Sequence, residues 1–157
     1  MEAAPLRPAT GADHGAVHRV VAAAFDKYVD RIGRRPAPMD ADFTAALDDS
    51  RVWVIDDGDA PQAVLVLEYH DDHVLIDTVA VLPTAQGRGY GARLLRRAEA
   101  QAGDLGLPEV RLYTNEAMSE NLAYYPRQGY QETGRRSEDG YRRVYFRKLI
   151  SPAPFKI

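Results

Sequence analysis

Hydrophobic residues recur with a helical period in the first part of the chain. Val17, Val20, Val21 and Ala24 fall on one side of a helix, so we predict a first helix that ends near Phe25. The segment RIGRRPAPMD that follows contains two prolines and a glycine, which predicts a long, basic loop before a shorter helical piece.

Strand-like patterns dominate the middle and the end of the chain. The expected strands, after a short extended piece near residue 6, are residues 51–57, 62–69, 74–82, 109–114 and the two arms of a hairpin within 131–149. A helix with Leu94, Leu95 and Ala98 on one face lies between the third and fourth of these runs. A second, short helix is expected over SENLAYYPRQ, with Ser119 as its N-cap. These elements predict an α+β fold of about six to seven strands and four helices.

Composition limits the domain organisation and the classes of function. A chain of 157 residues fits one domain, with residues 151–157 as a loose tail. The net charge of -3 gives no general reason to expect a nucleic acid or a membrane as partner. The absence of cysteine excludes disulfides and an acyl-cysteine intermediate, and with no signal-peptide pattern at the start we expect a cytoplasmic protein. His14 and His18 are spaced i, i+4 without a third ligand nearby, so no metal site is expected.

The segment QGRGYGARLL, residues 86–95, carries three glycines at every second position between a strand and a helix. Glycine is costly in regular structure, but a turn without side chains lets a phosphate approach the free amides at a helix N-terminus. Arg88 lies inside this turn, and Arg93, Arg96 and Arg97 follow it. The pattern therefore predicts either a phosphate site or a tight turn flanked by solvated arginines.

A dinucleotide is one ligand that this turn would fit, because GRGYGA satisfies G-x-G-x-x-G/A. In the dinucleotide fold, however, the strand runs directly into the first glycine at the start of a long domain. Here four residues intervene, and only about half of the chain remains. The match is therefore weak.

A second motif narrows the choice. LIDTVAVLPTAQGRGYGARLL has the order strand, R/Q-x-x-G-x-G/A, helix, and NLAYYPRQGY has an aromatic, a tyrosine, three residues, then glycine and an aromatic. Together they resemble the GNAT family of N-acetyltransferases over nearly the whole chain. The resemblance implies a mixed, mostly antiparallel central sheet in which the two central strands splay apart, and a homodimer is one possible assembly.

The resemblance also implies acetyl-CoA as co-substrate and assigns residues to it. Val79, Ala80 and Val81 would meet the pantetheine arm, and Asn121 would approach the cofactor from the short helix. The pyrophosphate would lie on the turn formed by Gln86, Gly87, Arg88, Gly89, Tyr90, Gly91 and Ala92.

The implied chemistry is direct acetyl transfer from the thioester to a primary amine. Tyr125 occupies the family's position for the acid that protonates the departing thiolate, although a role as a core aromatic is the alternative. An amine with a pKa near ~10 must lose a proton, and Asp77, Glu68 or a chain of water molecules can accept it. Asp77 lies in an otherwise apolar strand, whereas Glu68 stands at a strand end, where we expect it to be solvated.

We therefore interpret the chain as an acetyl-CoA-dependent N-acetyltransferase whose acceptor is a small-molecule or peptide amine. Arg31, Arg34 and Arg35 would suit an acidic acceptor, but the aspartates that follow them would suit a cation. The leading alternative is a non-catalytic module on the same fold that binds or senses acyl-CoA. A dinucleotide-dependent enzyme is the third hypothesis.

Overall fold

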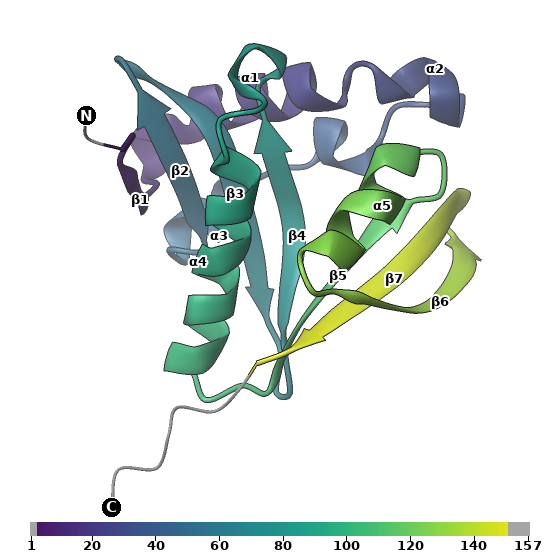
Figure 1. Cartoon of the computed structure of the whole chain (residues 1–157). Coiled ribbons are helices and arrows are strands. Elements are labelled where there is room, and N and C mark those ends of the chain that lie inside the picture. The colour runs from purple at the N-terminus through teal and green to yellow at the C-terminus, as the bar shows by residue number, and fades with distance from the viewer. Residues whose placement is uncertain (1–2, 151–157) are drawn as a thin grey trace, which may run out of the picture. The chain divides into compact units, whose positions relative to one another are not determined.

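The computed structural model describes residues 3–150, and the expected tail at 151–157 lies outside the described residues (Figure 1). Within these described residues, seven strands pair in the order β1-β2-β3-β4-β5-β7-β6. Only the pair β4–β5 is parallel among the pairings of known register, and the others are antiparallel. The predicted α+β fold with a mixed, mostly antiparallel sheet is thus confirmed. The described residues form two compact units, 3–67 with 77–94 and 68–76 with 95–150.

The first unit is built from strands with helices between them. Its elements are β1 (Leu6–Pro8), η1 (Gly11–Asp13), α1 (His14–Phe25), α2 (Tyr28–Ile32), η2 (Ala37–Asp40), α3 (Thr44–Asp48), β2 (Val52–Asp57), most of β3 (Ala60–Tyr69), the second part of β4 (Val74–Val81), η3 (Pro83–Ala85) and the first turn of α4 (Tyr90–Asp104).

The predicted stripe on α1 faces the core of this unit. Its four residues are buried together with alternate residues of the neighbouring strands, Val52 and Val54 from β2 and Val64 and Val66 from β3. Alternate residues of a strand point to the same face of the sheet. The apolar stripe of α1 therefore packs on the apolar faces of β2 and β3, and this contact buries mainly hydrophobic side chains. The expected end of this helix at Phe25 is also confirmed.

One helix was not predicted. The residues Tyr28–Ile32 form α2, so the described part of the chain contains five α-helices where four were expected. Tyr28 is buried, with the cations of Lys27 and Arg31 at 5.0 and 5.2 Å from its ring centre. Gly33 ends the helix with φ +83° and donates its N–H to the Val29 carbonyl at 2.9 Å. Burial of one aromatic ring thus stabilises a helical turn that is too short to show a hydrophobic period.

The second unit contains the later turns of α4, followed by β5 (Glu109–Asn115), α5 (Ser119–Arg127), β6 (Gln131–Glu138) and β7 (Tyr141–Leu149). Helix α5 covers one face of these strands (Figure 1), where Tyr125 lies against Phe146 of β7 with ring centres 5.7 Å apart. The parallel pairing of β4 with β5 joins Val74–Ile76 to Val110–Leu112 and stops there.

The expected N-cap of α5 is wrong. Met118 occupies the cap position, and Ser119 is the first helical residue, with its hydroxyl bonded to the neighbouring Glu120 at 3.2 Å. Asn115 turns the chain instead, because its side-chain oxygen accepts the Ala117 N–H at 2.9 Å. Among residues 3–150, no helix combines the length and the apolar character that crossing a membrane requires.

Candidate functional site

The glycine turn lies in the first unit, between the end of β4 and the start of α4. Gly87 and Gly89 have φ values of +83° and +81°, a left-handed conformation that side chains disfavour, while the space around both α-carbons is open. Gly91 is already helical in the first turn of α4. Backbone conformation therefore explains two of the three glycines without any ligand.

Two side chains of this turn are bonded to the end of β2. Arg88 donates from Nη1 to Oδ2 of Asp57 at 2.5 Å, and the hydroxyl of Tyr90 donates to the same oxygen at 2.8 Å. Tyr90 is buried, whereas the Arg88 side chain is 53% exposed. The sequence did not indicate Asp57, because it lies 31 residues before Arg88, at the end of a strand.

The arginines further along α4 are bound elsewhere. Arg96 donates to Glu99 at 2.9 Å and to Gln128 at 3.1 Å, and Arg97 donates to Gln101 at 3.2 Å. Their guanidinium groups stabilise the second unit. Arg88, inside the turn, and Arg93, in the first turn of α4, are therefore the two arginines whose positions suit a phosphate.

The residues expected along β4 divide between its two faces. Ala80 is 3% exposed and belongs to the core beneath α1, so only its backbone can meet a ligand. Asp77, Val79 and Val81 share the other face and are half-buried. Just after the end of β4, the Leu82 N–H donates to the Gln62 carbonyl at 2.9 Å. This bond fixes the segment that leads into the glycine turn to β3.

Tyr125 and Asn121 lie one helical turn apart on α5, in the second unit. Tyr125 is 6% exposed, and its ring contacts those of Phe146 and Tyr130. Asn121 donates from Nδ2 to Oγ1 of the buried Thr114 at 3.0 Å. This bond fixes the face that α5 turns toward β5, and Thr114 is a second residue that the sequence did not indicate.

Two other tyrosines lie near Tyr125. Tyr124 is half-buried, and burial raises the pKa of its phenol. Burial and then the carboxylate of Glu99 raise the pKa of Tyr130, whose hydroxyl donates to Glu99 at 3.1 Å. Tyr130 is thus committed to a structural bond.

The remaining titratable candidates lie at the surface. Glu68 is 49% exposed and lies 2.7 Å from the ring of His70, as expected for a residue at a strand end. His14 packs edge-on against His18 at 4.8 Å. In the part of the chain that the structure describes, no group of three or more His, Cys, Asp or Glu side chains is arranged to hold a metal ion.

The family model for the acetyltransferase (GNAT) domain matches residues 48–132, which is more than half of the chain and includes the glycine turn and Tyr125. The chain belongs to the GNAT family. A search of curated proteins found no significant match.

Solved structures with the GNAT fold resemble nearly the whole chain. The ribosomal-protein-S18-alanine N-acetyltransferase of Escherichia coli has a TM-score of 0.76 at 16% identity, covering 99% of each chain. The PaiA N-acetyltransferase of Thermoplasma acidophilum, in complex with coenzyme A, has a TM-score of 0.78 at 13% identity, covering 94% of this chain and 99% of that one. N-acetylglutamate synthase of Neisseria gonorrhoeae, with coenzyme A and N-acetyl-glutamate, has a TM-score of 0.72 at 18% identity, covering 96% of this chain and 36% of that one.

These likenesses establish the GNAT fold, and they leave the residue roles as predictions. Gln86, Gly87, Arg88, Gly89, Tyr90, Gly91 and Ala92 are brought together with Val79 and Val81 in the first unit. Tyr125 and Asn121 are brought together in the second unit.

Proposed function

We propose that this GNAT protein is an acetyl-CoA-dependent N-acetyltransferase that transfers the acetyl group to a primary amine by direct attack. The turn before α4 carries the proposal, because Gly87 and Gly89 adopt left-handed backbone directly ahead of a fifteen-residue helix. The first amides of such a helix have no partners within it and lie at the positive end of its dipole. They suit the pyrophosphate of acetyl-CoA.

The turn and β4 supply the binding groups in this proposal. The amides of Gln86–Ala92 and the charge of Arg88 bind the pyrophosphate, and the backbone of Val79–Val81 binds the pantetheine arm. The burial of the Ala80 side chain supports a backbone role for this strand. Asn121 donates from Nδ2 to Thr114 and to the sulfur of Met118, and its side-chain oxygen serves as the acceptor for the cofactor.

The transfer requires three proton movements besides the exchange of bonds. Asp77, or a chain of water molecules, first removes the extra proton of the ammonium and passes it to solvent. The amine nitrogen then forms a bond to the carbonyl carbon, the bond from that carbon to sulfur breaks, and Tyr125 protonates the thiolate. The second proton, which the nitrogen loses as it becomes an amide, restores the phenol of Tyr125. A phenol suits the acid role, since its usual pKa of ~10 lies close to the ~8.5 of a thiol.

The acceptor class stays open between proteins and small molecules. One structural relative is named for the alanine of a ribosomal protein, and another binds N-acetyl-glutamate. The cytoplasmic location expected from the sequence also stays a prediction.

The decisive experiment is a panel of amines with acetyl-CoA, with the release of free thiol as readout. The panel contains amino acids, polyamines, aminoglycosides and short peptides with free N-termini. Thiol release with one class of amine supports the proposal and identifies the acceptor. Acetyl-CoA binding without release for any amine would favour the non-catalytic acyl-CoA module.

The shift in Tm on adding a ligand distinguishes the acetyl-CoA proposal from the dinucleotide hypothesis. A ligand at a hundred times its Kd stabilises the fold by about 2.7 kcal/mol, or roughly 5 to 10 °C in Tm for a chain of this size. We expect this shift with acetyl-CoA and none with NAD. The opposite result would assign the glycine turn to a dinucleotide.

A further inference from the structure

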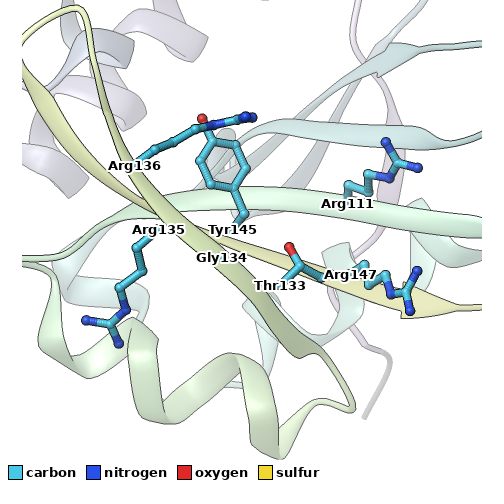
Figure 2. Close-up of a pocket in the computed structure, with 7 residues that line it drawn as sticks. All are labelled: Arg111, Thr133, Gly134, Arg135, Arg136, Tyr145 and Arg147. Carbon is cyan, nitrogen blue, oxygen red and sulfur yellow. The ribbon is translucent and has the colours of Figure 1, made fainter.

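A pocket of about 440 Å³ lies in the second unit and is lined by strands β5, β6 and β7 (Figure 2). Tyr145 and Arg147 alternate with Phe146, which packs toward α5, so the pocket occupies the opposite face of the sheet from Tyr125. It is therefore separate from Tyr125, and the inference about its ligand does not rest on the proposed acetyl transfer.

Arginine dominates the lining. Arg111 of β5 and Arg147 of β7 extend at one end, and Arg136 of β6 lies over the ring of Tyr145 at the other, with its guanidinium carbon 4.2 Å from the ring centre (Figure 2). Arg135 also contributes to the wall, but its guanidinium extends away to bond Glu132 at 3.0 Å. None of the lining residues is acidic.

The pair Arg111 and Arg147 concentrates positive charge. The two residues stand directly opposite each other in the antiparallel pairing of β5 with β7, where like charges destabilise a sheet. Glu109 offsets part of this charge, since its Oε1 accepts from Nε of Arg111 at 2.9 Å. Its buried Oε2 has no hydrogen-bond partner and lies 3.7 Å from Arg147, too far for a hydrogen bond. One buried carboxylate thus faces two guanidinium groups.

Carboxylates at the rim of the pocket pair with the arginines but do not use all of their N–H donors. Arg111 also donates to Asp72 at 3.4 Å, and Arg136 pairs with Glu138. Both carboxylates are exposed or half-exposed, and such pairs contribute little to stability. Each guanidinium has five N–H donors, so a second anionic partner can bind beside the first.

A bulge shapes the floor of the pocket. The pairing of β6 with β7 shifts register between Glu132 and Gly134, which leaves Thr133 as an extra residue. Gly134 lies opposite Tyr145, and a side chain there would meet nothing within 4 Å. The absence of a side chain leaves room beside the Tyr145 ring, with Thr133 adding a hydroxyl to the lining.

We propose that this pocket binds a small organic anion that carries two or more carboxylate or phosphate groups. Its volume falls in the range of small-molecule sites, about 300 to 1,000 Å³. Guanidinium groups match carboxylate and phosphate oxygens in a two-pronged geometry. The separation of Arg111 and Arg147 from Arg136 and Tyr145 provides two ends, one for each anionic group.

The test is an NMR titration of the ¹⁵N-labelled protein with citrate and with inorganic pyrophosphate at constant ionic strength. Bound anion should shift the amides of Thr133 and Gly134, which line this pocket, more than the amides of Gly87 and Gly89 in the glycine turn. Arg147→Gln and Arg136→Gln should each weaken binding about tenfold or more, the usual effect of losing a charged hydrogen bond. Arg111 is left unchanged, because its loss would strand the buried carboxylate of Glu109.

Arg142→Gln is the matched control. Arg142 lies in the same hairpin with its side chain 81% exposed, and it is not among the lining residues. Binding in this variant should stay within about twofold of wild type, and the melting temperatures of all three variants should confirm that they fold. Equal weakening in the control would reveal a diffuse charge effect and overturn the proposal. The absence of shifts with either anion, or shifts only with an acidic peptide such as oligoglutamate, would overturn it as well.

Discussion

Arg88 donates a hydrogen bond from Nη1 to Oδ2 of Asp57 at 2.5 Å and so ties the glycine turn to the end of β2. Tyr90, which follows Gly89 in the sequence, donates its hydroxyl to the same oxygen. The arginine inside the turn is therefore already paired with an acid. Asp57 orders the turn, but it also places a negative charge beside the proposed pyrophosphate site.

We predict that Asp57→Asn lowers the KM for acetyl-CoA about two- to fivefold. The Arg88 and Asp57 side chains are 53% and 41% exposed, so losing their charge pairing should change stability little. Asparagine keeps an oxygen that accepts the same hydrogen bonds. In water, the repulsion between an anion and a unit negative charge is about 1 kcal/mol at about 4 Å and about 0.5 kcal/mol at about 8 Å. Removing this repulsion gives the expected two- to fivefold change in KM.

Steady-state kinetics at two salt concentrations checks this prediction. Screening should shrink the difference from wild type as salt rises. Asp59→Asn, an equal charge change in the same hairpin, is the control and should have a smaller effect. A higher KM in Asp57→Asn would mean that ordering the turn matters more than its charge.

The glycines of the turn should respond differently to alanine. Gly89 has φ +81°, where a side chain costs about 1 to 2 kcal/mol, so Gly89→Ala should lower Tm by several degrees and raise the KM for acetyl-CoA. Gly91 is helical, where alanine is favoured by about 0.5 to 1 kcal/mol. Gly91→Ala should therefore raise Tm slightly and leave KM within about twofold of wild type, as the G/A position of the motif suggests.

Calorimetry and kinetics on the two glycine variants provide the comparison. A large rise in KM for a stable Gly91→Ala protein would contradict this division. It would show that the ligand approaches the backbone at Gly91 so closely that even a methyl group interferes.

The features that the sequence predicted depend on local pattern. The α1 stripe and the motif around Tyr125 each involve residues within two helical turns, where spacing determines which side chains share a face. The missed features depend on distant residues. Asp57 reaches Arg88 across 31 positions, and α2 forms because Tyr28 is buried. The arginine pocket requires the register of three strands and a bulge at Thr133, which no local pattern specifies.

Asp13 should make stability depend on pH in the acid range. Hydrogen bonds from Arg7 lower the pKa of this carboxyl from 3.8 to about 2. A folded-state pKa below the unfolded value stabilises the fold above pH ~4, and this contribution is lost as pH falls from ~4 toward ~2. Because the Arg7 side chain is 37% exposed, we discount the contribution to about 1 kcal/mol.

Urea unfolding of Asp13→Asn and wild type between pH 7 and pH 3 tests this expectation. The free energies of unfolding should differ by about 1 kcal/mol at pH 7, and the gap should narrow below pH 4. Asp71→Asn, in an exposed turn, is the control and should match wild type throughout. A gap that stays constant to pH 3 would show that the carboxylate charge is not the cause.

Tyr125→Phe tests the proposed proton donor with least disturbance to the fold. The variant keeps the ring that packs against Phe146 and Tyr130, so stability should fall by no more than about 1.5 kcal/mol. Only the step that needs the phenolic proton should suffer, and loss of a general acid lowers rates by ~10² to 10⁴. With a true acceptor we expect turnover to fall in this range at nearly constant affinity for acetyl-CoA, the pattern of an interaction made only in the transition state.

Two further tyrosines supply the controls for this prediction. Tyr124 is half-buried beside Tyr125, and a helix turns ~100° between neighbours, so Tyr124→Phe should leave turnover nearly unchanged. Tyr130→Phe should cost stability through its lost bond to Glu99 while sparing the chemistry. Because the three variants remove the same hydroxyl from one aromatic cluster, their comparison separates packing from proton transfer. Wild-type turnover in Tyr125→Phe would remove this phenol from the mechanism and leave water as the acid, and a larger loss at Tyr124 would assign the donor to that ring instead.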